Sequence, residues 1–332
     1  MAAQDSVETV TGPIAADELG MTLAHEHLLY RDEAVHFHWP HLETLAPKEP
    51  YRFGYDAEYE LALESARDVL GHGVRTVVEP TGMFGGRDVE FSRRVAEETG
   101  LQVVACTGIY TYDHLPMFFI TRDADFMAGL FVHDIKSGMR DTGIKAAFIK
   151  CAADEPGVTE NVEKVHRAAA RAHVQSGAPI MAHSRPANQT AIRQLEIFEE
   201  EGVDLSRVHI AHTGDTDDLD HIERILDKGA FIGMDRYGLE LFLPFEKRNS
   251  TVLALLERGY ADRMMLSQDY CASFDWYPPE MEEQLLAAGA ARDWSMTLVF
   301  EQVIPALREG GMSDAQLETM MVENPKRWLA GD

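Results

Sequence analysis

The sequence predicts a single (β/α)8 barrel, and three observations support this prediction. Short apolar, β-branched runs recur along the 332 residues, and an amphipathic stretch rich in Ala, Glu, Leu and Arg follows each of them. Eight such units follow one another with no low-complexity linker, so we expect one domain over residues 1–332. A doubly wound sheet is the alternative, but the first strand ends in His25-Glu26-His27 and not in a glycine-rich phosphate turn.

The predicted strands are short and mostly apolar. They are Met21–His25, Val74–Glu79, Leu101–Thr107, Ile144–Cys151, Ala178–His183, Arg207–His212, Ala230–Met234 and Arg263–Asp269. The segment before them, Val7 to Ile14, is typical of a short N-terminal hairpin that would cap the barrel floor. Long loops are expected after the first, third and eighth strands, at the C-terminal face where a barrel keeps its specificity.

The predicted helices carry apolar residues at helical spacing. They are Ala57–Leu70, Val89–Thr99, Val158–Gln175, Ala187–Glu201, Thr216–Lys228, Ser250–Arg258 and Trp294–Arg308. A glycine that can stop a helix in the left-handed conformation precedes several of the strands. These glycines are Gly71, Gly100, Gly177, Gly202 and Gly229.

Composition excludes several classes of partner. The chain has 56 acidic and 30 basic residues, a formal charge of -26, and no concentrated basic patch, so nucleic acid and anionic membrane surfaces would be repelled. Three cysteines without close spacing argue against a disulfide framework or a cysteine zinc site. The N-terminus lacks the pattern of a signal peptide, and no apolar run is long enough to span a membrane. We therefore expect a cytoplasmic protein.

Residues that can bind metal gather where the predicted strands end. His25 and His27 are two apart on the first strand, so their side chains point to the same side. Four more candidates lie at or next to the C-terminal ends of strands four, five, six and eight, where barrel active sites are built. They are Lys150, His183, His212 and Asp269.

Lys150 is unusual in such a set because an ammonium group cannot bind a cation. Reaction of its amine with carbon dioxide would give a carbamate, an anion whose two oxygens can bridge two metals. The alternative is a strand-end lysine paired with an acidic neighbour. By strand alternation His209, three residues before His212, should point to the helix layer.

These motifs make the chain similar to the phosphotriesterase family of the amidohydrolase superfamily. They are Thr22-Leu-Ala-His-Glu-His27, Phe148-Ile-Lys150, Ala182-His-Ser184, His209-Ile-Ala-His-Thr-Gly-Asp-Thr216 and Leu266-Ser-Gln-Asp-Tyr270. The resemblance covers nearly the whole chain. It implies a homodimer and two divalent metal ions per chain, zinc first, with iron, cobalt or manganese also acceptable to the ligands.

Residue by residue, the resemblance implies a role for each ligand. His25, His27 and Asp269 would hold the buried metal, and His183 and His212 the exposed one. Carboxylated Lys150 and a hydroxide would bridge the two metals.

Two features resemble the lactonases within this family. One is Gly108-Ile-Tyr110, whose tyrosine would reach the hydroxide and the substrate oxygen, although Tyr110 is also compatible with simple packing in the barrel mouth. The other is Asp235-Arg236, where Arg236 with Asp215 would orient neighbouring groups; a plain salt bridge is an equally good interpretation.

The loop after the eighth strand adds candidates for substrate binding. Trp276 matches a lactonase tryptophan that lines the acyl-chain channel, and Phe274 would extend this apolar surface. The run Met117 to Phe119 suits either the same surface or a dimer interface. His36, His38 and His41 form a histidine-rich loop that lacks a carboxylate partner, and Cys271 has no assignable role.

These residues predict a metal-dependent hydrolase that opens lactone rings, with N-acyl homoserine lactones (quorum quenching) as the favoured substrates and weak phosphotriesterase activity. Tyr110 would stabilise the oxyanion, while Asp269 would carry a proton from the hydroxide to the leaving ring oxygen. The alternatives are a phosphotriesterase or general esterase, and a catalytically inert barrel that only binds. A phosphate-binding barrel is disfavoured because no glycine-rich cradle follows strands seven and eight.

Overall fold

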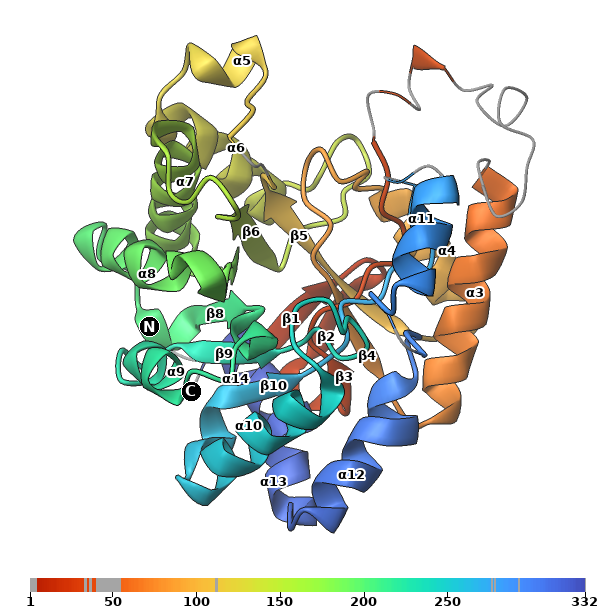
Figure 1. Ribbon diagram of the computed structural model, residues 1–332. Helices are drawn as coiled ribbons and strands as arrows, with labels where there is room; N and C mark the ends of the chain where they lie inside the picture. The colour runs from red at the N-terminus through yellow and green to blue at the C-terminus, as the bar shows by residue number, and fades with distance from the viewer. Residues whose placement is uncertain are drawn as a thin grey trace.

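A barrel of eight parallel strands forms the centre of the molecule, as predicted. The computed structural model describes residues 5–32, 35, 38–39, 55–110, 113–275, 277, 279–291 and 293–331. The strands are β3 (Thr22–Leu23), β4 (Thr76–Glu79), β5 (Gln102–Gly108), β6 (Phe148–Ala152), β7 (Ile180–His183), β8 (Val208–Ala211), β9 (Phe231–Met234) and β10 (Met264–Leu266). Their order in the sheet follows the chain, and helices surround them (Figure 1).

Backbone hydrogen bonds join the two ends of the sheet just beyond β3 and β10. The N–H of Asp269 donates to His25 O (3.2 Å), and the N–H of His27 donates to Tyr270 O (2.8 Å). Further along, the N–H of Ala272 donates to His27 O (2.9 Å). The residues that follow the first strand therefore lie directly beside those that follow the eighth.

Helices cover the outside of the barrel, and neighbouring ones such as α6, α7 and α8 pack against each other. The longer ones are α3 (Tyr55–Gly71), α4 (Val89–Thr99), α6 (Ala124–Lys136), α7 (Glu160–Ser176), α8 (Thr190–Glu200), α9 (Leu219–Leu226), α10 (Phe245–Glu257) and α11 (Pro279–Ala287). The shorter ones are α5 (Met117–Ile120), α12 (Ile304–Glu309), α13 (Asp314–Glu318) and α14 (Asn324–Ala330). Single turns are η1 (Ala16–Glu18), η2 (Pro186–Asn188), η3 (Leu205–Arg207), η4 (Thr213–Asp215), η5 (Tyr260–Arg263), η6 (Val299–Val303) and η7 (Thr319–Glu323).

The helix layer differs from the sequence prediction in several details, since α5, α6, α11, α13 and α14 were not predicted. Helix α6 occupies part of what was expected to be loop after the third strand. Its apolar residues include exposed Phe126 and Leu130 as well as buried Met127, so the sequence shows no clean helical stripe. Gly71 does not stop α3; the left-handed residue is Gly73, with φ of +89°, and its N–H bonds Leu70 O (3.0 Å).

The floor of the barrel is closed by apolar packing. The interior cluster includes Met181 and Phe231, and the Trp328 ring of α14 lies 5.4 Å from the Phe148 ring. The predicted hairpin is present as β1 (Ser6–Thr9) and β2 (Gly12–Ala15), and its Val7 joins this cluster. The open end of the barrel is therefore the C-terminal end of the strands, where the candidate ligands lie.

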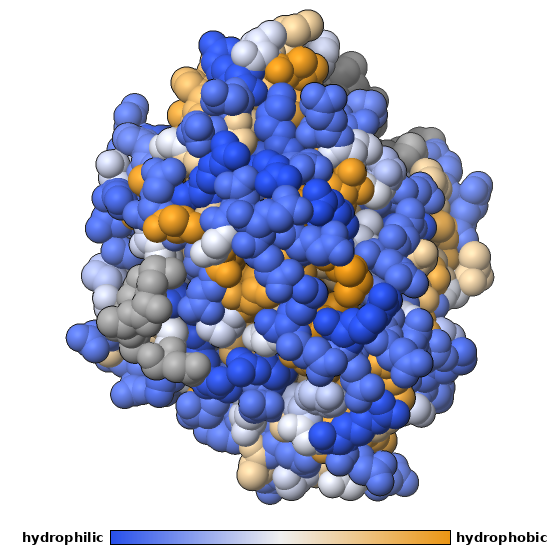
Figure 2. Space-filling view, turned by 90° about the vertical axis from the view of Figure 1, so that its left-hand side faces the viewer, coloured by the Kyte–Doolittle hydropathy of each residue, from blue (hydrophilic) through white to orange (hydrophobic). Residues whose placement is uncertain are grey.

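Hydrophilic residues dominate the face shown in Figure 2, with hydrophobic ones in scattered patches. This is the distribution expected for a chain with such an excess of acidic residues. Within the described residues, no helix combines the length and the apolar content needed to cross a membrane.

Candidate metal centre and substrate cavity

A cavity of about 300 Å³ opens at the C-terminal end of the barrel. All six predicted metal ligands line this cavity: His25, His27, Lys150, His183, His212 and Asp269. Apolar and aromatic side chains make up much of its wall: Tyr30, Leu239, Leu241, Phe242, Phe274, Leu285 and Leu286. The ends of the strands thus bring the polar cluster together, and the segments that follow β3, β9 and β10 add the apolar wall.

His25, His27 and Asp269 converge in the first half of this cluster. Asp269 Oδ1 lies 3.3 Å from His25 Nε2 and 3.2 Å from His27 Nε2. Ligand atoms about 2.1 Å from a tetrahedral zinc lie roughly 3.4 Å apart, so this spacing fits a bound divalent cation. The donor set of two imidazoles and a carboxylate is also one that such cations accept.

Lys150 lies beside this cluster and is buried. Its Nζ is 3.3 Å from His25 Nε2 and 3.4 Å from Met181 Sδ. Burial lowers the pKa of Lys150, although Asp269 acts in the opposite direction. A neutral amine is the form that can react with carbon dioxide, and an unmodified ammonium here would repel a cation.

His183 and His212 form the second half of the cluster, with ring centroids 4.4 Å apart. Burial lowers the pKa of His183 to about 4 and holds that of His212 well below its usual range. Both rings are therefore neutral at pH 7, which is the form that binds metal.

Each candidate histidine ligand has one ring nitrogen fixed by an acceptor outside the cluster. Asp235 Oδ2 lies 2.9 Å from Nδ1 of His25, and its Oδ1 lies 3.1 Å from Nδ1 of His212. His27 Nδ1 lies 2.6 Å from Thr81 Oγ1, whose hydroxyl donates to Glu79. The other ring nitrogen stays available for a cation, as in carboxylate–histidine–metal arrangements.

His183 follows the same rule with the opposite nitrogen. Its Nε2 lies 2.6 Å from Asp154 Oδ2, which leaves Nδ1 for a cation. His25, His212 and Asp235 also lie close enough to share an ion. Because both carboxylate oxygens of Asp235 already accept hydrogen bonds from these rings, we assign Asp235 to orientation and not to metal binding.

The backbone just past two strands decides where the ligands point. His212 has φ of +64° and Asp269 has φ of +52°, both in the left-handed region. This turn breaks the strand alternation, so both Ala211 and His212 face the interior. The prediction that His209 points to the helix layer is therefore wrong: its ring lies 5.3 Å from Trp328 inside the barrel.

Arg236 links two carboxylates at the edge of the cluster. Its Nε donates to Asp269 Oδ2 (2.9 Å) and its Nη1 donates to Asp215 Oδ2 (3.1 Å). Burial lowers the pKa of Arg236, but Asp215 and Asp269 outweigh this and raise it, so the guanidinium remains charged. It also lies 4.4 Å from the centre of the Phe242 ring, at the start of the apolar wall.

Tyr110 and Phe274 both line the cavity. The Tyr110 ring packs edge-on against His183 with centroids 5.2 Å apart. The Phe274 ring stacks on Tyr30 at 5.7 Å. Tyr110 thus lies over the second half of the cluster, and Phe274 lies in the apolar wall.

Other predicted residues lie elsewhere or outside the described part of the chain. Trp276, His36 and His41 lie outside the described residues. The run Met117 to Phe119 is absent from the described lining of the cavity, and Met117 is 73% exposed. Phe118 is also exposed, whereas Phe119 is buried in the core, and both the interface and the homodimer stay predictions.

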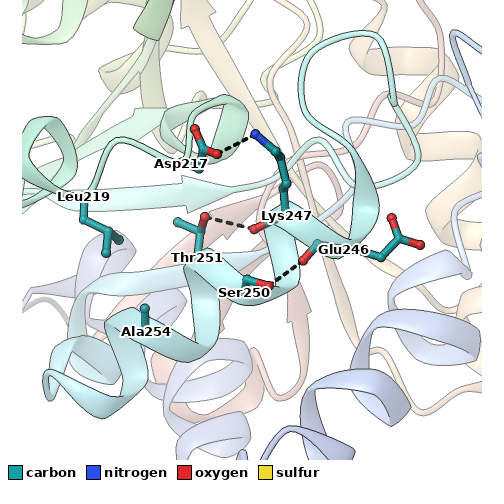
Figure 3. A pocket seen from close by; sticks show the side chains of 7 residues that line it. All are labelled: Asp217, Leu219, Glu246, Lys247, Ser250, Thr251 and Ala254. Atoms are coloured by element: carbon teal, nitrogen blue, oxygen red, sulfur yellow. Dashed lines mark hydrogen bonds and ion pairs between the residues drawn. The ribbon is translucent and has the colours of Figure 1, made fainter.

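A second hollow lies on the outer surface between the start of α9 and α10 (Figure 3). Its Lys247 bonds Asp217 (2.8 Å), and the hydroxyls of Ser250 and Thr251 donate to the carbonyls of Glu246 and Lys247. Lys247 and the hydroxyls of Ser250 and Thr251 already have partners within this hollow. This hollow therefore lacks the converging ligands that mark the barrel mouth.

The fold and the site define the class as a barrel hydrolase with a candidate metal centre. The model of the phosphotriesterase family matches residues 5–329, and the chain belongs to that family. An aryldialkylphosphatase of Saccharolobus solfataricus is 46% identical over 319 residues, 96% of this chain and 97% of that protein. A phosphotriesterase homology protein of Mycobacterium tuberculosis is 40% identical, over 97% of this chain and 96% of that one. The solved phosphotriesterase structure from Mycobacterium tuberculosis superposes with a TM-score of 0.89 at 39% identity, covering 98% of both chains.

Sequence reasoning missed several residues that support the ligands. Asp154 comes two residues after β6, so the rule that polar groups at strand ends are functional would have found it. Thr81 likewise comes two residues after β4, so the same rule would have found it. Glu26 carries no comparable signal, because the serine that it bonds is 241 residues away.

Proposed function

We propose that the protein is a metal-dependent lactonase that opens N-acyl homoserine lactones and hydrolyses phosphotriesters weakly. The observation that carries this proposal is the direct contact between a candidate metal centre and an apolar wall. Tyr110, Arg236 and Phe274 line one cavity together with all six candidate ligands. A lactone ring placed over the ligands would then extend its acyl tail along Leu239, Phe242 and Leu286.

The donor set fits two divalent cations, held by the six ligands with Lys150 as its carbamate. When bound, the cations would polarise the ester carbonyl as Lewis acids and acidify a water enough for attack at neutral pH. His25, His27 and Asp269 would hold one cation, and His183 and His212 the other.

The chain's own residues then handle charge and protons. Asp269 takes a proton from the attacking water and returns it to the ring oxygen as that oxygen leaves, so one lactone and one water give one hydroxy acid. Arg236 fixes the Asp269 carboxylate in place through its 2.9 Å hydrogen bond. The Tyr110 hydroxyl donates to the carbonyl oxygen as negative charge develops there. An Asp269→Asn protein that kept its metals and full turnover would rule out this role.

The test combines metal content with substrate preference. Purified protein is analysed for metal, then assayed on a homoserine lactone with a long acyl tail and on paraoxon, before and after chelation. We expect about two metals per chain and chelator-sensitive lactone turnover far above paraoxon turnover. Metal-free protein with undiminished turnover would contradict the ligand assignment, and turnover of paraoxon alone would contradict the lactonase assignment.

Phosphotriester hydrolysis is the second candidate. The relative from Saccharolobus solfataricus is named an aryldialkylphosphatase, which supports the same site acting on a phosphorus centre. The ratio of kcat/KM on the two substrates decides which activity is primary.

A further inference from the structure

Glu26 lies between two candidate ligands but points the other way. Successive side chains of an extended segment alternate, so the carboxylate of Glu26 faces away from the cavity that His25 and His27 line. Its side chain is fully buried, and its backbone N–H donates to Val78 O (3.0 Å). A buried carboxylate is costly unless several donors satisfy it.

The donors that satisfy Glu26 all come from one short turn, residues 267–270. Oε1 accepts from Ser267 Oγ (2.6 Å), from Gln268 N (2.9 Å) and from Gln268 Nε2 (2.9 Å). Oε2 accepts from Tyr270 N (2.8 Å). Two carboxylate oxygens offer about four acceptor positions, so these four contacts use the acceptor capacity of the group.

The residue in the middle of this turn is Asp269, a candidate ligand and the proposed proton carrier. Its φ of +52° is unfavourable for a residue with a side chain and persists only where the surroundings impose it. The Glu26 carboxylate accepts from the backbone N–H groups of Gln268 and Tyr270, on either side of Asp269. The N–H of Asp269 itself donates to His25 O (3.2 Å). Three consecutive N–H groups are therefore tied to the His25-Glu26 pair.

Gln268 makes three further hydrogen bonds that hold the same turn. The amide of Gln268 donates to Met296 O (2.8 Å) and accepts from Val299 N (3.1 Å), and Trp294 Nε1 donates to Gln268 O (2.8 Å). These bonds anchor Gln268 but none of them reaches Asp269. Among the described side chains, that of Glu26 accepts from the backbone N–H on each side of Asp269.

We propose that Glu26 is a positioning residue that sets the orientation of Asp269 toward His25 and His27. The inference rests on the proposed metal-dependent function. Glu26 touches neither substrate nor cation; it acts by imposing the left-handed backbone of Asp269. Without its carboxylate the turn relaxes, and the convergence of Asp269 Oδ1 with the two imidazoles, now 3.2 and 3.3 Å, is lost.

The test uses Glu26→Gln in the full chain, which keeps the size of the side chain but replaces one acceptor oxygen with a donor. Chelated protein is titrated with Co²⁺, and the visible absorption of the bound cobalt reports its affinity and coordination. We expect cobalt affinity to fall about 10- to 100-fold, the usual effect of removing a group that orients ligands, with a changed absorption band. On a lactone, kcat should fall while KM stays near the wild-type value.

Two further variants separate positioning from general stability. Ser267→Ala removes one of the four donors, together with the acceptor of the His25 backbone N–H (3.0 Å), and should lower cobalt affinity in the same direction. Asn324→Ala is the matched control, because Asn324 donates to Ala261 O (2.8 Å) and Met264 O (2.7 Å) at the opposite end of β10. It should lower thermal stability and leave cobalt affinity unchanged.

Glu26→Gln and Ser267→Ala proteins that bind cobalt with wild-type affinity and spectrum would overturn this inference but leave the proposed function standing. A wild-type protein that binds no cobalt would overturn the proposed function, and the inference with it. Equal losses of cobalt affinity in Glu26→Gln and Asn324→Ala would also overturn it, because the effect would then follow stability.

Discussion

The guanidinium of Arg236 holds the carboxylate of Asp269 at 2.9 Å, and the same group reaches Asp215 at 3.1 Å. A planar guanidinium can satisfy two carboxylates at fixed angles, whereas the ammonium of lysine is a point charge on a flexible stem. Asp269 therefore depends on Arg236 for its position as well as for charge balance.

Arg236→Lys should lower kcat/KM on a lactone about 10- to 100-fold, because Asp269 loses its fixed partner although the positive charge remains. Steady-state kinetics measures this, with metal content determined on the same preparation. Lys247→Ala breaks the exposed ion pair with Asp217 and serves as the control, which should leave activity unchanged. If Arg236→Lys kept the wild-type kcat/KM, the contact between Arg236 and Asp269 would be a salt bridge with no role in orienting Asp269.

Gly233→Ala should weaken metal binding without altering a ligand. A Cβ at Gly233 would overlap the carboxylate of Asp235 and approach His209 Nε2 to 2.8 Å. Displaced, Asp235 could no longer orient both His25 and His212. We expect cobalt affinity to fall about 10-fold or more in titrations of the chelated protein.

The control for this variant is Gly129→Ala on α6, where an added Cβ meets no atom within 4 Å. This change should stabilise the fold by about 0.5–1 kcal/mol through helix propensity and leave metal affinity as it is. Unchanged affinity in Gly233→Ala would argue that Asp235 does not set the ligand geometry.

Phe274→Ala should discriminate between lactones by the length of their acyl tails. The Phe274 ring lies in the apolar wall, stacked on Tyr30 at 5.7 Å. Loss of this surface should cost a long-tailed lactone about 1.5–3 kcal/mol of binding and a short-tailed one much less. The ratio of KM values for the two lactones measures the difference, and an unchanged ratio would place the tail elsewhere.

The sequence predicted the barrel and the convergence of the six candidate ligands for a physical reason. Parallel strands end at one face, so polar residues at strand ends such as His183 must meet there. It failed where the backbone leaves the regular pattern: the left-handed turn at His212 reversed the alternation on which the orientation of His209 was judged. It also missed Glu26, because the donors of that residue lie in the turn after β10, which only the closed barrel brings near.

Acid should destabilise the fold partly through His166, which lies on α7 and packs against Phe198 of α8. Its Nδ1 donates to Val162 O (2.8 Å), and its Nε2 accepts from Gln194 (2.8 Å), so the folded protein requires a neutral ring. Burial lowers its pKa from 6.5 to about 4. The unfolded chain therefore binds more protons between these values, and stability rises with pH in this window.

The contribution of His166 is fully present above pH 6.5 and is lost as the pH falls toward 4. Between pH 7.5 and 5 this amounts to about 2 kcal/mol. His166→Gln cannot titrate, so its free energy of unfolding should fall by about 2 kcal/mol less than that of wild type over this range. Urea denaturation of both chelated proteins at the two pH values measures the difference. If the free energies of unfolding of both proteins changed equally with pH, the folded protein would accept a proton on His166 without loss of stability. That result would contradict the assignment of Nε2 as the acceptor of the Gln194 hydrogen bond.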